Sequence, residues 1–199
     1  MGLGKQAKTL NRSQIKMIGD TLLGNRYGLR DQTIFFFSVK CGLRAKEIAN
    51  LKWSMVMESD GCVGNYLYLP NSSSKGRSGR IVPLHKNLKD NLIEMVKEHQ
   101  TNNEFDPSTS FIIVTERSKS TTPQSIVNMF QRWYRRLGLV GCSSHSGRRT
   151  FITETSKKIS IVGGSLRDIQ MMVGHSSLQT TQRYIDGDSE CQRRVVDLL

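Results

Sequence analysis

The chain of 199 residues is strongly basic, with 29 Lys and Arg against 17 Asp and Glu and a formal net charge of +12. This length fits one domain with a sizeable core. An enzyme of neutral metabolites has no need of such a charge, which predicts a polyanionic partner. No apolar run approaches the roughly 18 residues that span a bilayer, and the N-terminus shows neither a signal nor a transit pattern. We therefore expect a cytoplasmic protein without a membrane partner.

The cysteines are scattered singly, with no Cys-x-x-Cys pair and no Cys/His cluster at metal-ligand spacing. They are Cys41, Cys62, Cys142 and Cys191. Free thiols in a reducing compartment are the simplest interpretation, and we expect no bound metal.

Apolar spacing and capping residues predict helices at both ends of the chain, with a small β element between them. The expected helices cover residues 11–24, 31–41, 43–53, 86–100, 123–137, 146–157 and 165–174, followed by a short one that carries Tyr184. Strand patterns at "NYLYLP" and "GRIVPL" flank a polar loop, which predicts a β-hairpin with basic residues at its tip. A further short strand is expected at "SFIIVTE".

Several polar groups are candidates for handling a phosphodiester. Arg44 follows a helix-ending glycine, and Glu47 lies three residues on, where it can hold the guanidinium. His145 and Arg148 are also three apart, near a helix start. Taken singly, each has a plainer interpretation: a surface ion pair worth at most about 1 kcal/mol, a solvated helix terminus, or a tyrosine at 184 that only packs.

The hairpin cluster of Lys75, Arg77 and Arg80 likewise fits ordinary protection of a strand edge. The order of the motifs is more specific. Along the chain come Arg44 in "GLRAKEI", Lys75 before "RIVPL", His145 and Arg148 in "HSGRRTFIT", and His175 and Tyr184 in "GHSSLQTTQRYI".

This series resembles the tyrosine recombinases of the phage integrase family, over about residues 10 to 185. The resemblance implies an α+β fold, mainly helical with a small antiparallel sheet, and a site-specific recombinase that cleaves and rejoins DNA through a covalent 3′-phosphotyrosyl intermediate. It implies no cofactor, neither a divalent ion nor ATP. The partner would be double-stranded DNA, bound by a homotetramer that is a monomer or weak oligomer when free, with accessory DNA-bending proteins possible and association with the nucleoid.

The resemblance also implies roles for the matching residues. Tyr184 would be the nucleophile, and Arg44 and Arg148 would stabilise the transition-state charge. Lys75 would protonate the leaving oxygen, His145 would assist proton transfer at the tyrosine, and His175 would donate a hydrogen bond to the phosphate. Glu47 would fix Arg44. The expected DNA-backbone contacts are Arg77, Arg80, Arg132, Arg135, Arg136, Arg149, Lys157 and Lys158.

Three features depart from the family pattern. Gly147 stands where a large aliphatic residue is more usual, and the segment "SKKISIVGGSLRD" is slightly long. We expect residues 1–9 to be a tail and residues 10–199 the catalytic domain, with no core-binding domain evident before it. The chain is then a stand-alone domain, like the short recombinases of fimbrial switches, or a fragment. The terminal segment "CQRRVVDLL" can pack in cis or dock on a neighbour.

Other functions compete with recombination. A type IB topoisomerase has similar chemistry but relaxes supercoils without joining two sites. A DNA-binding regulator would keep the fold without strand cleavage. A hydrolytic nuclease is the least favoured because the sequence shows no acidic metal cluster.

Overall fold

The computed structural model describes residues 6–71, 79–101, 104–184 and 196–197. In chain order the elements are α1 (Arg12–Leu23), α2 (Gly28–Cys41), α3 (Ala45–Ala49), η1 (Trp53–Met55), β1 (Tyr66–Leu69), β2 (Arg80–Pro83), α4 (Lys86–Gln100), α5 (Pro123–Arg136), α6 (Ser146–Ser156), η3 (Ile159–Val162), α7 (Leu166–Val173) and α8 (Leu178–Gln182). The expected class, mainly helical with a small antiparallel sheet, is confirmed.

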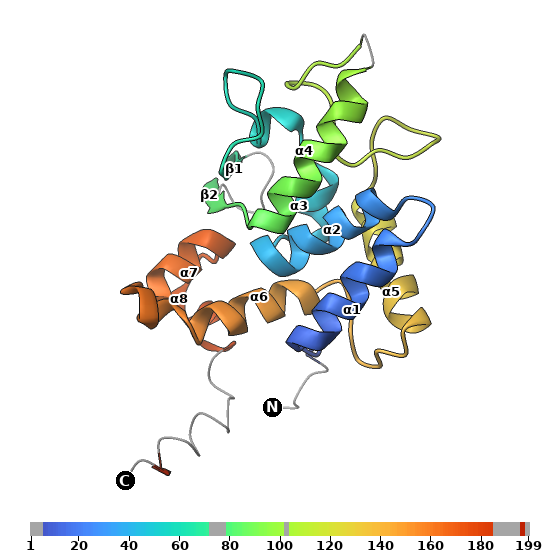
Figure 1. Cartoon of the computed structure of the whole chain (residues 1–199). Helices are drawn as coiled ribbons and strands as arrows, with labels where there is room; N and C mark the ends of the chain where they lie inside the picture. The colour runs from blue at the N-terminus through green and yellow to red at the C-terminus, as the bar shows by residue number, and fades with distance from the viewer. Residues whose placement is uncertain (1–5, 72–78, 102–103, 185–195, 198–199) are drawn as a thin grey trace.

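Helix α2 forms the centre of the molecule, and α1, α4 and α6 pack against it (Figure 1). Its apolar run explains this position, because Phe35 and Phe37 are fully buried and a helix that is apolar on most sides is stable only when covered. The large core extends from α1 to α5. A separate small cluster, built on Ile152, Ile169 and Val173, joins α6 to α7.

The hairpin pairs β1 with β2 in antiparallel register, with Leu67 opposite Val82. Side chains alternate between the two faces, as strand geometry requires: Leu67 and Val82 are buried, whereas Tyr66 and Ile81 are exposed. Arg80 shares the inward-facing register of Val82. The alternation therefore directs a guanidinium into the protein interior.

Local capping signals place the helix ends close to their predicted positions. Asn11 and Gln14 form a reciprocal capping box at α1, and Thr122 caps α5 ahead of Pro123. One strand prediction is wrong. Residues 110–116 form only isolated bridges, including Lys52 with Phe111, because the segment opposite turns into the 3-10 helix η1 from Trp53 onward.

Gly147 lets α6 approach α2 closely. A Cβ atom at this position would lie 2.3 Å from the Ser38 Oγ, a distance at which something must shift. We expect Gly147→Ala to lower the free energy of unfolding by roughly 1–3 kcal/mol through overpacking, as measured by urea or thermal unfolding. Gly24→Ala is the matched control, because a Cβ there has no neighbour closer than 3.6 Å. Equal stability of the two variants would contradict this explanation.

Candidate active site

An open cavity of about 520 Å³ lies where α6 and α8 face the start of α3. Among its lining residues are five that the sequence singled out: Arg44, His145, Arg148, His175 and Tyr184. They come from segments separated by up to 140 positions in the chain, and the fold alone brings them together. Lys75 and Arg77 lie outside the described residues.

Arg44 precedes α3, and its guanidinium is held from one side by Glu47, whose Oε1 accepts a hydrogen bond from Arg44 Nη1 at 3.2 Å. The predicted contact between Arg44 and Glu47 is therefore present. The other side of the guanidinium faces the cavity, and 32% of the Arg44 side chain is exposed. A ligand in the cavity can therefore reach it.

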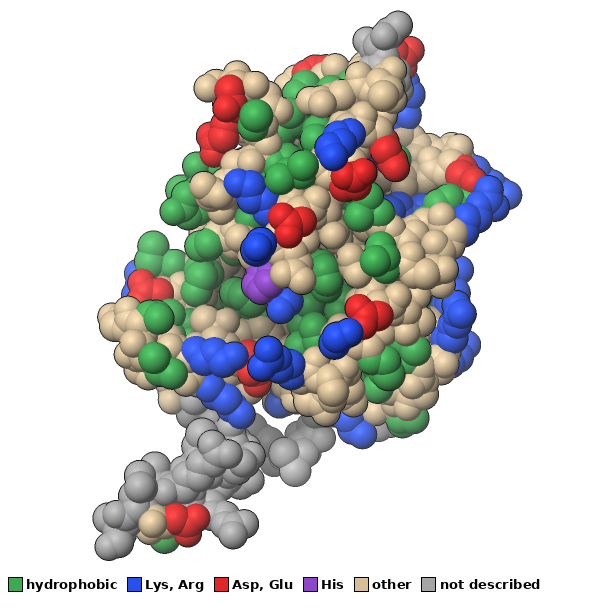
Figure 2. All heavy atoms as spheres, viewed as in Figure 1, with side chains coloured by type: hydrophobic (Ala, Val, Ile, Leu, Met, Phe, Trp, Pro, Cys, Tyr) green, Lys and Arg blue, Asp and Glu red, His purple; other side chains and the backbone are tan. Residues whose placement is uncertain are grey.

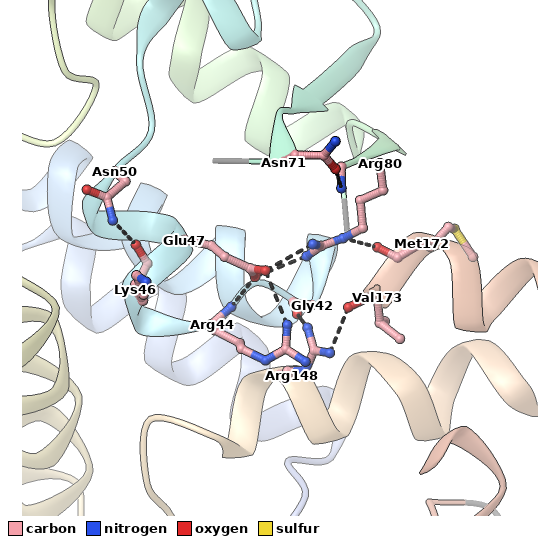
Figure 3. Close-up of polar contacts among 11 residues, drawn as sticks. Gly42, Arg44, Lys46, Glu47, Asn50, Asn71, Arg80, Arg148, Met172 and Val173 are labelled. Carbon is pink, nitrogen blue, oxygen red and sulfur yellow. Dashed lines mark hydrogen bonds and ion pairs between the residues drawn. The ribbon is translucent and has the colours of Figure 1, made fainter. Parts of the chain in front are cut away.

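The position of Arg80 contradicts the prediction that this residue contacts DNA. Its side chain is only 4% exposed, and it donates to both carboxylate oxygens of Glu47, at 2.9 and 3.0 Å (Figure 3). Burial raises the pKa of Glu47, but the hydrogen bonds and charge of Arg80 outweigh it, so the pKa is lowered and Glu47 stays ionised. A buried arginine engaged in this way is not available to a DNA backbone.

Arg148, on the first turn of α6, is 3% exposed. Its guanidinium donates to the carbonyl oxygens of Gly42 at 2.6 Å and Val173 at 2.7 Å. Burial and the neighbouring charge of Arg44 lower its pKa to about 9, which still leaves a cation at pH 7. Figure 3 shows the guanidiniums of Arg44, Arg80 and Arg148 converging around Glu47.

His175 follows the left-handed Gly174, which ends α7 at φ +63°. The ring nitrogen Nδ1 lies 2.9 Å from the hydroxyl of Thr181, a fully buried side chain. Either group can donate in this hydrogen bond, depending on the tautomer of the ring; the tautomer in which the hydroxyl donates to Nδ1 leaves the proton on Nε2. In that tautomer His175 presents an N–H donor without carrying a charge.

Tyr184 lies two residues beyond the end of α8, in a tighter turn closed by its N–H and the carbonyl of Thr181 at 3.0 Å. The prediction that it lies within the short helix is therefore wrong by a few residues. Its ring stacks on that of His175, with 5.6 Å between centroids. His145 is exposed at the start of α6, on the same cavity.

The model of the phage integrase family matches residues 8–190. The chain belongs to this family. Among similar proteins, tyrosine recombinase XerD of Ralstonia nicotianae is 28% identical over 179 residues, which cover 89% of this chain and 55% of the relative. The chain thus spans little more than half the length of that protein.

Solved structures of related integrases show the same fold. The crystal structure of XerA recombinase superimposes with a TM-score of 0.75 at 21% identity, over 96% of this chain and 64% of that one. XerH site-specific recombinase bound to palindromic difH substrate, in a post-cleavage complex, gives a TM-score of 0.74 at 19% identity, over 94% and 51%.

The remaining candidate DNA contacts of this integrase-family chain fall into two groups by their distance from the cavity. Arg149 lines the cavity, and so does Arg183, which the sequence interpretation missed although it precedes Tyr184 directly. The residues Arg132, Arg135, Arg136, Lys157 and Lys158 lie away from the cavity lining, on α5 and at the end of α6. Figure 2 shows Lys and Arg side chains gathered along the edge near α5 and below, near α6. Their contact with DNA stays a prediction.

The described residues include no group of three or more His, Cys, Asp or Glu placed to hold a metal ion. Among those same residues, no helix is long and apolar enough to cross a membrane.

The surroundings of His175 in the cavity lower the pKa of its ring, so that protonation of His175 affects stability at acidic pH. Burial and the charges of Arg148 and Arg44 lower its pKa from an ordinary 6.5 to about 4. Because the unfolded chain takes up this proton first, the stability that the neutral ring contributes is complete above about pH 6.5 and is lost as the pH falls toward 4. We expect ¹⁵N NMR to show a neutral Nε2–H ring at pH 7. Thr181→Val should remove the tautomer preference, and a charged ring at pH 6 would contradict this picture.

Proposed function

We propose that this chain is the catalytic part of a site-specific DNA recombinase, and that Tyr184 breaks and rejoins strands through a covalent 3′-phosphotyrosyl intermediate. The observation that carries the proposal is the convergence of the five residues Arg44, His145, Arg148, His175 and Tyr184 on a single open cavity. A chain with a net charge of +12 supplies the general attraction to DNA.

The proposed reaction conserves the energy of the phosphodiester bond. The Tyr184 oxygen forms a bond to phosphorus while the bond from phosphorus to the 5′-oxygen breaks. The phenol proton passes toward His145, and the leaving 5′-oxygen takes a proton from Lys75, which is a family-derived role for a residue outside the described structure. A 5′-hydroxyl attacking the phosphotyrosine reverses these steps and rejoins a strand.

Arg44 and Arg148 would stabilise the negative charge on the two non-bridging oxygens. Their positions support this role, because both guanidiniums are fixed by the protein before any ligand binds and both line the cavity. Preorganised donors of this kind are typically worth 10²–10³-fold in rate each. His175 would add an uncharged N–H donor to the same phosphate.

Similar proteins that are named recombinases, one of them solved on its DNA substrate, support DNA as the partner. Assembly of a homotetramer on two duplexes, accessory DNA-bending proteins and docking of the C-terminal segment on a neighbour remain parts of the proposal. That segment lies almost wholly outside the described residues.

The test uses nicked suicide duplexes drawn from the DNA that flanks the gene, in which loss of a short fragment traps the cleaved state. We expect a slowly migrating covalent adduct on a denaturing gel, with the nucleotide on the peptide that holds Tyr184 by mass spectrometry. Sequence-specific binding without any adduct would instead favour a DNA-binding regulator, and relaxation of plasmids without joining of two sites would favour a topoisomerase.

A further inference from the structure

The carboxylate of Glu47 is more fully engaged by Arg80 than by the active-site arginine. Its two oxygens accept one hydrogen bond each from the Arg80 guanidinium, in a paired arrangement. Arg44 contributes its backbone N–H at 2.8 Å and one guanidinium N–H at 3.2 Å. Glu47 is 2% exposed and would be costly to bury without a full counter-charge. Arg80 provides that charge from inside the protein.

This division of contacts leaves Arg44 open to a ligand. A guanidinium has five N–H donors, and among the described residues only one hydrogen bond is made by that of Arg44. Without Arg80, Arg44 would be the remaining cation hydrogen-bonded to the buried carboxylate among the described residues, because nearby Arg148 donates to carbonyl oxygens instead, so the carboxylate would attract the Arg44 guanidinium inward. The donors that face the cavity would then turn away from it.

Arg80 also holds the end of α7. Its Nε donates to the Met172 carbonyl at 2.8 Å, next to the Val173 carbonyl that Arg148 engages. Carbonyl groups in the last turn of a helix lack intrahelical partners, and cations stabilise them. The next residue, Gly174, leaves room for Arg80, since a Cβ added there would lie 2.9 Å from Nη1. His175 follows immediately.

We propose that Arg80 is a positioning residue of the active site: it neutralises Glu47 so that Arg44 keeps its donors for the scissile phosphate, and it fixes the end of α7 that carries His175. This inference rests on the proposed strand-cleavage function. In this proposal the β1–β2 hairpin contributes to the active site, because Arg80 is the first residue of β2.

The test compares Arg80→Gln and Arg80→Lys with Val82→Ala, a matched control that is buried on the same strand and has no part in the Glu47 contacts. At saturating DNA we expect Arg80→Gln to cleave about 10²-fold more slowly than the wild type, as for a misplaced reacting group, with little change in DNA affinity. Arg80→Lys should recover part of the rate because it restores the charge. Val82→Ala should lose thermal stability but keep its cleavage rate.

A substrate with a methylphosphonate at the scissile position separates positioning from general damage. It lacks the charge that Arg44 would neutralise, so the loss in Arg80→Gln should be roughly tenfold smaller on it than on the phosphate. Equal losses on both substrates would overturn the inference. If Arg80→Gln does not fold, the same ratio is measured for Arg80→Lys.

A readout in the free protein keeps this inference distinct from the proposed function. The Nε–H signal of Arg44, assigned by its loss in Arg44→Lys, should shift in Arg80→Gln and in Arg80→Lys but not in Val82→Ala. An unchanged signal in both Arg80 variants would refute the positioning role, even if the wild type formed no adduct on the DNA tested. Absence of a wild-type adduct together with a shifted signal would count against the cleavage function alone.

Discussion

Tyr184→Phe is expected to abolish the covalent protein–DNA adduct while leaving DNA binding and thermal stability nearly unchanged. The phenyl ring keeps the stacking on His175 and the contact with the small cluster, so only the oxygen that would attack phosphorus is lost. Among the described residues that line the cavity, Tyr184 is the one tyrosine, so no other lining group there can form a phosphotyrosyl ester. The measurement is a denaturing gel of adduct formation beside a native gel of binding.

Tyr66→Phe is the matched control for this variant. Tyr66 is exposed on the outer face of the hairpin, and its loss of a hydroxyl should leave the adduct yield at the wild-type level. An adduct formed by Tyr184→Phe would disprove the assignment of the nucleophile, whatever the behaviour of Tyr66→Phe.

Arg148→Gln is expected to slow cleavage at saturating DNA by about 10³-fold, the upper range for one preorganised donor. The change removes a cation from the transition state and leaves the carbonyls of Gly42 and Val173 without their buried donor. Each unsatisfied carbonyl costs about 1–3 kcal/mol, so the melting temperature should fall as well. Cleavage therefore has to be measured well below that temperature, with the folded fraction verified by circular dichroism.

Arg149→Gln provides the neighbouring control. Arg149 lines the same cavity but donates to the backbone carbonyl of Ala7, at the cavity edge. We expect it to weaken DNA binding and reduce the salt dependence by about one charge, with a nearly unchanged rate at saturation. A rate loss as large as that of Arg148→Gln would remove the distinction between the two arginines.

The sequence predicted those parts of the fold that depend on neighbours in the chain. Helix ends at Asn11, Thr122, Ser165 and Gly174 follow from capping side chains or a left-handed glycine, and these signals act within a few residues. Motif order predicts the cavity residues, because no local signal shows that Arg44 and His175 share one site.

The features that the sequence does not predict depend on which side chains the fold buries and which segments it brings together. The basic loop before Arg80 predicts a position on the DNA surface, yet strand alternation places Arg80 with Val82 on the inner face. The alternation of inward and outward residues can be read from "RIVPL". The buried partner of Arg80, Glu47, lies 33 positions earlier in the chain, where no local signal points to it. Residues 110–116 have the composition of a strand but lack a partner strand. Composition alone cannot predict whether a partner strand is present.

The separation of the two apolar clusters means that the active-site groups differ in how firmly they are anchored. Arg44 and Glu47 begin a helix that is packed on the large core, whereas Tyr184 rests at the edge of a cluster with three fully buried residues. Because local opening free energy follows the apolar contacts that must be broken, the segment that carries the proposed nucleophile Tyr184 opens at lower cost than the segment that carries Arg44. In the strand cleavage proposed above, a DNA end joined to Tyr184 would therefore be held by the more weakly anchored of the two segments.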